Sequence, residues 1–165
     1  MKFYAQDIMT SNVITVRPDM LCEDVAEILI ANRISGAPVV SDSDELIGVI
    51  SFQDILLNSG QNFFYSSNYF EESRIDAVLE QEGLHLTTIT DGFVSDYMTR
   101  HVFTVFPDTP VQELSSTMFD HRIHRVIVLD RKTMMPVGIV TTFDLLKILA
   151  QKISPSQGGE LLETV

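Results

Sequence analysis

The feature that most constrains the fold is an internal repeat of roughly 90 residues, which covers most of the chain. The stretch DIMTSNVITVRPD, which begins at Asp7, returns as DYMTRHVFTVFPD from Asp96, with Asp, Met, Thr, Val, Thr, Val, Pro and Asp in the same places. The stretch GVISFQD from Gly48 likewise returns as GIVTTFD from Gly138. Agreement of this extent limits the chain to an architecture built from two similar half-units.

Each copy begins with a short β pattern, which a helical pattern follows. Residues Val13–Val16 and Val102–Val105 are mostly β-branched or aromatic, so they predict short strands. Apolar residues at helical spacing then predict a helix in each copy, namely Leu21, Val25, Ile28 and Leu29 in the first and Val111, Leu114 and Met118 in the second. The sequence TPVQ from Thr109 predicts where the second of these helices starts, with the threonine as its cap in a capping box and the proline at the first helical position.

Each copy ends with a hairpin pattern and a second helix. Two apolar runs separated by a turn, APVVS and LIGVIS in the first copy and RVIVLD and VGIVT in the second, predict β-hairpins that are too apolar to face water. A helix is expected from Phe52 and another from Thr142. Each copy is therefore β-α-β-β-α and small for a stable domain, so we expect an α/β (α+β) fold in which the copies pack sheet against sheet.

The formal net charge of −12 limits the partners of the chain. A field of this sign repels a phosphate backbone, so no nucleic-acid partner is expected. The apolar runs are too short to cross a bilayer and Asp7 interrupts the place of a signal peptide, so we expect a soluble, cytoplasmic protein without membrane insertion. Cys22 is the only cysteine, which fits a reducing compartment and a buried, inert thiol.

A hydroxyl and a carboxylate stand three residues apart in both copies, at Ser51 and Asp54 and at Thr141 and Asp144. This spacing places both side chains on one side of a first helical turn. One interpretation is ordinary helix capping. The other is ligand binding, because an ionised carboxylate can accept hydrogen bonds from two neighbouring ribose hydroxyls. The repetition favours a ligand site, and both interpretations can hold together.

The two copies differ most in the basic stretch DHRIHRVIV. It contains Arg122, His124 and Arg125, whereas the first copy offers only Arg33 followed by ISGAP. A guanidinium can bind a phosphate in two-point fashion, so these arginines are candidate phosphate contacts. The alternative is that they are surface arginines that form ion pairs with nearby carboxylates. The small residues of SGAP leave room for a purine or simply permit tight strand packing.

The order D-x-M-T, T-V-x-P and G-h-h-[ST]-x-x-D (h, apolar), present twice, resembles the cystathionine β-synthase (CBS) domain over residues 5–58 and 94–150, and two in tandem resemble a Bateman module. The resemblance implies two repeats related by a pseudo-twofold axis and two equivalent clefts. It implies adenosine ligands in one or both clefts, namely AMP, ADP, ATP or, with less support, S-adenosylmethionine. It also implies a homodimer.

By the same resemblance, the aspartates would bind ribose, the threonines of the first strands would lie beside the base or sugar, and backbone at the start of each hairpin would bracket adenine. The second-copy motif site, which we expect to be the stronger, comprises Thr104, His124, Arg125, Val126, Ile127, Thr141 and Asp144. The first-copy motif site comprises Thr15, Ala37, Pro38, Val39, Ser51 and Asp54. Candidate phosphate contacts are Arg33, Arg122 and Arg125.

Other features add little chemistry. His121 and His124 lie where a helix gives way to a strand, without a clear third ligand, so no metal is expected. No nucleophile elbow, phosphate-binding glycine loop or dinucleotide motif is present, so we expect no enzyme and no required cofactor. The expected division is repeat 1 over 1–60, a joining segment over 61–92, repeat 2 over 93–152 and a flexible tail over 153–165.

The joining segment holds NFFYSSNYF from Asn62, and the sequence after it predicts a helix that ends near Gly83. Aromatic residues this dense are expected to cover the core, line a dimer interface or close over a cleft. The function that fits best is a regulatory sensor of adenine nucleotides that acts on a separate protein. The alternatives are a ligand-free scaffold for dimerisation or protein interaction and, with little support, an unrecognised enzyme.

Overall fold

The computed structural model describes residues 2–57 and 92–152. The predicted aromatic cluster, the helix expected to end near Gly83 and the tail lie outside these residues. The first repeat contains α2 (Cys22–Ala31), β1 (Gly36–Val40), β2 (Leu46–Ser51) and α3 (Phe52–Leu57). The second contains β3 (Thr104–Val105), α6 (Val111–Asp120), β4 (Arg125–Leu129), β5 (Pro136–Thr141) and α7 (Thr142–Lys152).

Both predicted hairpins are confirmed. Strands β1 and β2 pair antiparallel with Gly36 opposite Ser51, and β4 and β5 do the same with Arg125 opposite Thr141. Strand β3 lies parallel to β4. The strand predicted over Val13–Val16 is reduced to a single parallel bridge between Val16 and Val39. The two repeats therefore share one topology, with a shorter leading strand than the β-branched pattern predicted.

The predicted cap of the first helix of repeat 2 is wrong. The N-cap of α6 is Pro110, which makes no side-chain capping bond. The hydroxyl of Thr109 instead accepts a hydrogen bond from the backbone N–H of Phe106 at 3.0 Å. The threonine thus closes the turn that precedes the helix, because it stands one residue too early to reach the first helical N–H groups.

The leading D-x-M-T segments are exchanged between the repeats. Helix α1 (Ala5–Ile8) precedes repeat 1, yet Ala5 is buried in the hydrophobic cluster of repeat 2. Helix α5 (Val94–Tyr97) precedes repeat 2, and Val94 is buried in the cluster of repeat 1. The repeats as the sequence divides them are therefore not the units that pack in space.

Backbone hydrogen bonds hold each exchanged segment in place. Thr10 and Ile139 exchange two of them, at 2.9 and 3.0 Å, and Thr99 and Val49 exchange two at 2.9 Å. The glycines of the repeated G-h-h-[ST] motif permit this approach. A Cβ on Gly48 would lie 2.9 Å from the sulfur of Met98, and a Cβ on Gly138 would collide with Met9.

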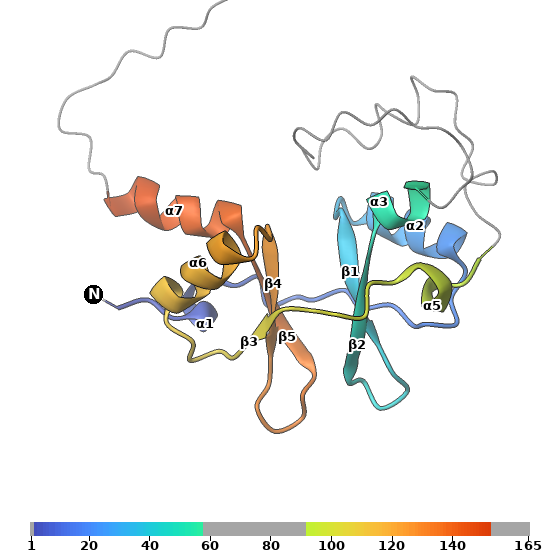
Figure 1. Ribbon diagram of the computed structural model, residues 1–165, viewed down its shortest axis with the longest axis horizontal. Helices are drawn as coiled ribbons and strands as arrows, with labels where there is room; N and C mark the ends of the chain where they lie inside the picture. Colours follow the sequence, from blue (N-terminus) through green and yellow to red (C-terminus); the bar gives the residue numbers. More distant parts are fainter. Residues whose placement is uncertain (1, 58–91, 153–165) are drawn as a thin grey trace, which may run out of the picture.

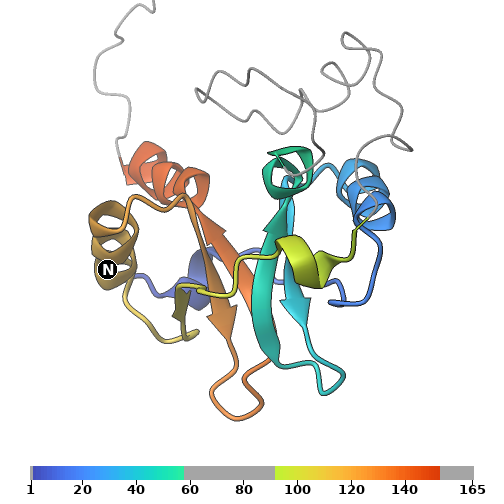
Figure 2. The ribbon, with the colours of Figure 1, turned by 45° about the vertical axis from the view of Figure 1, so that its right-hand side comes forward.

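The molecule is layered as helices, sheet, sheet and helices. Figure 1 shows the two sheets side by side in the middle, with α2 and α3 beyond one and α6 and α7 beyond the other, and Figure 2 shows the same order after rotation. Val40, Ile127 and Leu129 are buried but belong to neither helix-facing cluster. They face the opposite sheet, since strand residues alternate between faces. This middle layer joins the repeats about their pseudo-twofold axis.

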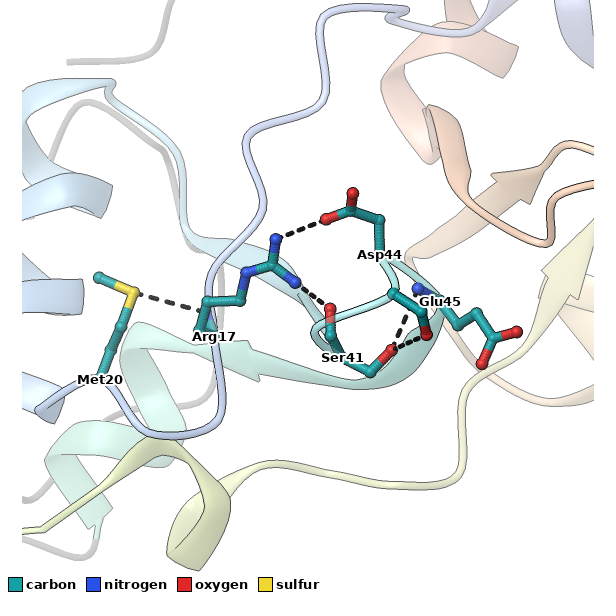
Figure 3. Close-up of polar contacts among 6 residues, drawn as sticks. Arg17, Met20, Ser41, Asp44 and Glu45 are labelled. Atoms are coloured by element: carbon teal, nitrogen blue, oxygen red, sulfur yellow. Dashed lines mark hydrogen bonds and ion pairs between the residues drawn. The ribbon is translucent and has the colours of Figure 1, made fainter.

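An ion pair joins each hairpin turn to the loop that follows the leading strand of the same repeat. The guanidinium of Arg17 donates to the backbone oxygen of Ser41 and pairs with Asp44 at 2.5 Å (Figure 3). In repeat 2 the polarity is reversed, because the arginine, Arg131, stands on the turn and bonds Asp108 of the loop at 2.7 Å. The hydrogen bond from Arg131 holds the pKa of Asp108 below its ordinary value. Arg131 also lies 4.1 Å from the centre of the Phe106 ring.

Arg33 and Arg122 end the first helix of their repeats in the left-handed region, both with φ of 53°. The N–H of Ile34 bonds the oxygen of Leu29 at 2.9 Å, and the residue after Arg122 repeats this bond at 3.0 Å. These are Schellman motifs, in which glycine is the usual residue because it has no Cβ. The two arginines therefore cost stability where they stand.

We predict that Arg122→Gly raises the free energy of unfolding by about 0.5–1 kcal/mol, because it relieves the left-handed strain of a residue with a Cβ. Urea denaturation measures the change. Arg131→Gly, which removes the same charge at a position outside the left-handed region, is the control and should lower stability. A loss of stability in Arg122→Gly as well would mean that the arginine side chain makes a stabilising contact that outweighs the strain.

Candidate functional site

The two hydroxyl and carboxylate pairs lie at the ends of β2 and β5, where each strand turns into a helix. Asp54 accepts hydrogen bonds on Oδ2 from the backbone N–H of Ser51 at 2.8 Å and from its hydroxyl at 2.6 Å. Asp144 accepts the same two bonds from Thr141, both at 2.8 Å. The capping interpretation is thereby confirmed, since each carboxylate reaches back to the residue that directly precedes its helix.

The two capping bonds of each aspartate end on the same oxygen, Oδ2. Within residues 2–57 and 92–152, no recorded hydrogen bond involves Oδ1 of Asp144. An ionised carboxylate has acceptor sites on both oxygens. The side chain of Asp144 can therefore hold its helix start with one oxygen and accept from a ligand hydroxyl with the other.

A large cavity of about 360 Å³ opens between the repeats beside Thr104. Its volume is within the range of small-molecule sites, roughly 300–1,000 Å³. Thr104 stands opposite Ile127 of β4, which is two residues from Arg125 on the same face of the strand. The remaining residues that line the cavity come from both repeats and are Glu45, Leu46, Ile47, Arg100, Val102, Leu129 and Met134.

A second, small cavity of about 60 Å³ is lined by Ser35, Ser51, Gln53 and Arg125. Arg125 starts from β4 of repeat 2, and its Nη2 donates to the hydroxyl of Ser35 in repeat 1 at 2.7 Å. Arg125 thus lies with the hydroxyl of the first-copy motif, although the sequence grouped it with the second. It also stands opposite Thr141 in the β4–β5 register. The candidate sites mix residues of both repeats.

Several predicted residues are buried, and three of them turn their side chains toward the helices. Ala37 and Val39 are buried in the cluster of repeat 1, and Val126 is buried in that of repeat 2. Pro38 is also buried, and its backbone oxygen already accepts the N–H of Val16 at 3.0 Å. Their side chains form packing surfaces, and a backbone contact to a ligand at these positions stays a prediction.

The remaining predicted residues are more exposed. Thr15 is exposed beside the bridge residue Val16. His124 is exposed, and its backbone oxygen accepts the N–H of Thr142 at 3.0 Å. Arg33 and Arg122 are exposed at helix ends and line neither of the two cavities. Their role as phosphate contacts stays a prediction.

The sequence missed Arg100 and Glu45, the two charged residues that line the large cavity. Arg100 directly follows the second D-x-M-T motif, where the first copy has Ser11, so this charge difference between the copies was a usable signal. Glu45 was visible only as part of an acidic turn. Its place at the cavity depends on how the two sheets pack.

Membrane-spanning helices and metal ligands can be assessed for the part of the chain that the structure describes. No helix there is long and apolar enough to span a bilayer. No three side chains among His, Cys, Asp and Glu gather there as candidate metal ligands.

We predict that Asp144→Ala lowers the free energy of unfolding by about 1–2 kcal/mol, because it removes the acceptor that caps α7. Asp144→Asn should lose less, since an amide oxygen can still accept the N–H of Thr141. Urea denaturation compares the two variants. Equal stability of the alanine variant and the unchanged protein would contradict a capping role.

Comparison with known proteins finds the same tandem arrangement. The family model for the CBS domain matches residues 5–59 and 94–151. A relative from Methanocaldococcus jannaschii, the uncharacterized protein MJ1232, is 30% identical over 146 residues, which are 88% of this chain and 39% of that protein. The chain therefore spans about two fifths of the length of this relative.

Solved structures share the fold. The CBS domain of a CBS domain-containing membrane protein from Sphaerobacter thermophilus is 36% identical, with a TM-score of 0.66 and coverage of 87% of this chain and 86% of that one. The CBS domain pair of protein MJ0100, solved with 5′-methylthioadenosine and S-adenosylmethionine, is 25% identical, with a TM-score of 0.66 and coverage of 92% and 99%.

Proposed function

Because the chain belongs to the CBS domain family and carries two of these domains in tandem, we propose that it is a regulatory module that binds an adenosine-type ligand, most readily AMP, ADP or ATP. The adenosine compounds held by the similar domain pair of MJ0100 support this ligand class. We further propose that the module acts on a separate protein and does not itself catalyse a reaction.

The observation that carries this proposal is the duplicated hydroxyl and carboxylate pair, whose first hydroxyl, Ser51, lines the small cavity together with Arg125 of the other repeat. Each aspartate is held by two hydrogen bonds from its own repeat, so its orientation is set before a ligand arrives. A ribose presents two neighbouring hydroxyls, which an ionised carboxylate accepts in charge-assisted bonds. The apolar residues that line the large cavity beside Thr104, namely Leu46, Ile47, Val102 and Leu129, are of the kind that a purine base needs, although none of the four motif residues lines this cavity.

The choice of a phosphorylated ligand rests on Arg125. Its guanidinium is close to the hydroxyl of Ser35 and lines the small cavity with Ser51. A ribose held by Asp54 would bring its 5′ substituent toward this part of the cleft. A guanidinium binds phosphate oxygens in two-point fashion, which supports AMP, ADP or ATP over an uncharged nucleoside.

Regulation requires that the ligand prefer one arrangement of the protein over another. The proposed cleft suits this requirement, because Arg125 of repeat 2 lines the small cavity together with Ser35 and Ser51 of repeat 1. A ligand that contacts both repeats favours the arrangement in which those contacts are made together. The resulting change would be read by a partner protein at the surface.

We predict that AMP, ADP or ATP, added at about 100 times its Kd, raises the stability of the folded chain by about 2.7 kcal/mol. Asp54→Asn and Asp144→Asn should weaken this effect without unfolding the chain, because each keeps an amide oxygen for capping but loses the carboxylate. Thermal unfolding with each nucleotide and with S-adenosylmethionine is the measurement. No stabilisation by any of the four compounds would contradict the proposal, and release of ADP from ATP would favour an enzyme instead.

A second candidate function, self-association or scaffolding, is favoured by exposed apolar side chains on α6 and α7. Phe119 is 83% exposed, Phe143 72%, Leu146 54% and Leu149 55%. Helices α6 and α7 lie together on one side of the molecule (Figure 2). In repeat 1 the motif position of Phe143 is occupied by Gln53. Exposed large apolar side chains in a group are typical of a protein contact, and we propose a homodimer through these side chains.

We predict that Phe143→Gln, which installs the residue of the first repeat, shifts the chain from dimer toward monomer, because it removes apolar area from the proposed interface. Light scattering across a concentration series measures the mass. Lys147→Gln, an exposed substitution on the same helix, is the control and should leave the mass unchanged. A monomeric unsubstituted chain at high concentration would contradict the homodimer.

A further inference from the structure

The two repeats differ at one position that their shared register makes equivalent. In β1 the residue opposite the motif hydroxyl of Ser51 is Gly36, and in β4 the residue opposite Thr141 is Arg125. The hairpin of repeat 2 thus carries a guanidinium beside its motif. The hairpin of repeat 1 has a glycine, which has no side chain, at the equivalent position. The pseudo-twofold symmetry is broken at the point where a ligand phosphate would need a cation.

Arg125 extends across the axis between the repeats. Its backbone lies next to Thr141, yet its Nη2 bonds Ser35 in repeat 1 at 2.7 Å. A Cβ on Gly36 would lie 3.3 Å from Nη1 of Arg125 and 2.8 Å from the backbone oxygen of Ile50. The missing side chain at Gly36 therefore leaves the space that this guanidinium fills. One arginine stands between both motif pairs.

Charge limits what two pseudo-equivalent sites can hold around a single guanidinium. Each site already contains a carboxylate, Asp54 or Asp144, and the chain as a whole carries a net charge of −12. Among the residues that the structure describes, Arg125 is the one cation that lines the small cavity, so a second anionic phosphate beside it would lack a paired cation and would be repelled by the first. A nucleoside without phosphate meets neither penalty.

We propose that one chain binds one phosphorylated nucleotide at a time but two uncharged nucleosides, because both clefts share Arg125 as their phosphate contact. This inference rests on the proposed function and adds the occupancy and the ligand charge to it. It makes the module a sensor of one nucleotide per chain despite its two motif pairs.

A different pair of arginines, one in each repeat, leads to the opposite expectation for the number of nucleotides bound. Arg33 and Arg122 occur once in each repeat, so if they held the phosphates, each cleft would accept its own nucleotide. Their positions speak against this, since they stand at the left-handed ends of α2 and α6 and line neither of the two cavities, whereas Arg125 lines the small one. The number of nucleotides bound per chain decides between the two expectations.

Isothermal titration of the full chain with adenosine and, separately, with ADP tests the proposal. We expect two adenosines and one ADP per chain. Arg125→Gln should weaken ADP binding by about tenfold or more, as expected for the loss of a charge-assisted hydrogen bond, and should weaken adenosine binding far less. Arg131→Gln removes the same charge at an exposed pair with Asp108, and it should change neither titration.

The outcomes separate this inference from the proposed function. Binding of two ADP per chain, or an unchanged ADP affinity in Arg125→Gln, would overturn the shared guanidinium and leave the nucleotide module intact. One adenosine per chain would overturn it too, because charge would then not explain the single site. Failure of adenosine, AMP, ADP and ATP all to bind would overturn both. Adenosine binding by Arg125→Gln shows that this variant is folded.

Discussion

The exchange of the leading segments is the constraint on which the rest of the structure depends. Backbone bonds between Thr10 and Ile139 and between Thr99 and Val49 complete each repeat with a segment that belongs to the other in sequence. Neither repeat can complete its hydrophobic core alone, because Ala5 is buried in the core of repeat 2 and Val94 is buried in the core of repeat 1. The two sheets are held face to face, and the clefts between them follow from that arrangement.

Stability and candidate function share the same atoms at the helix starts. The carboxylates of Asp54 and Asp144 stabilise α3 and α7 through one oxygen, and the hydrogen bonds that do so also orient the side chain. A group oriented by its own helix loses little conformational freedom when it meets a ligand. Capping and ligand binding are therefore compatible interpretations of one motif, as the spacing of its residues allowed.

Differences between the repeats carry more functional information than their likeness. The likeness produces two motif pairs, whereas Gly36 opposite Ser51 and Arg125 opposite Thr141 make the surroundings of the pairs unequal. The exposed apolar side chains of α6 and α7 are a second inequality, since Phe143 stands where repeat 1 has Gln53. A duplicated module with unequal halves can bind its ligand and its protein partner at different places.

The sequence by itself determined the duplication, the hairpins and the helices from Phe52 and Thr142, because apolar periodicity and turn residues are local properties. It also determined the capping aspartates, which act within three residues of the chain. It predicted the threonine cap of α6 wrongly, because the hydroxyl of Thr109 closes the preceding turn. Only the tertiary structure decided that Arg125 reaches Ser35 and that Glu45 and Arg100 line the cavity with Thr104. Those residues are far apart in the chain and are brought together by the packing of the two sheets. A local sequence pattern carries no information about that packing.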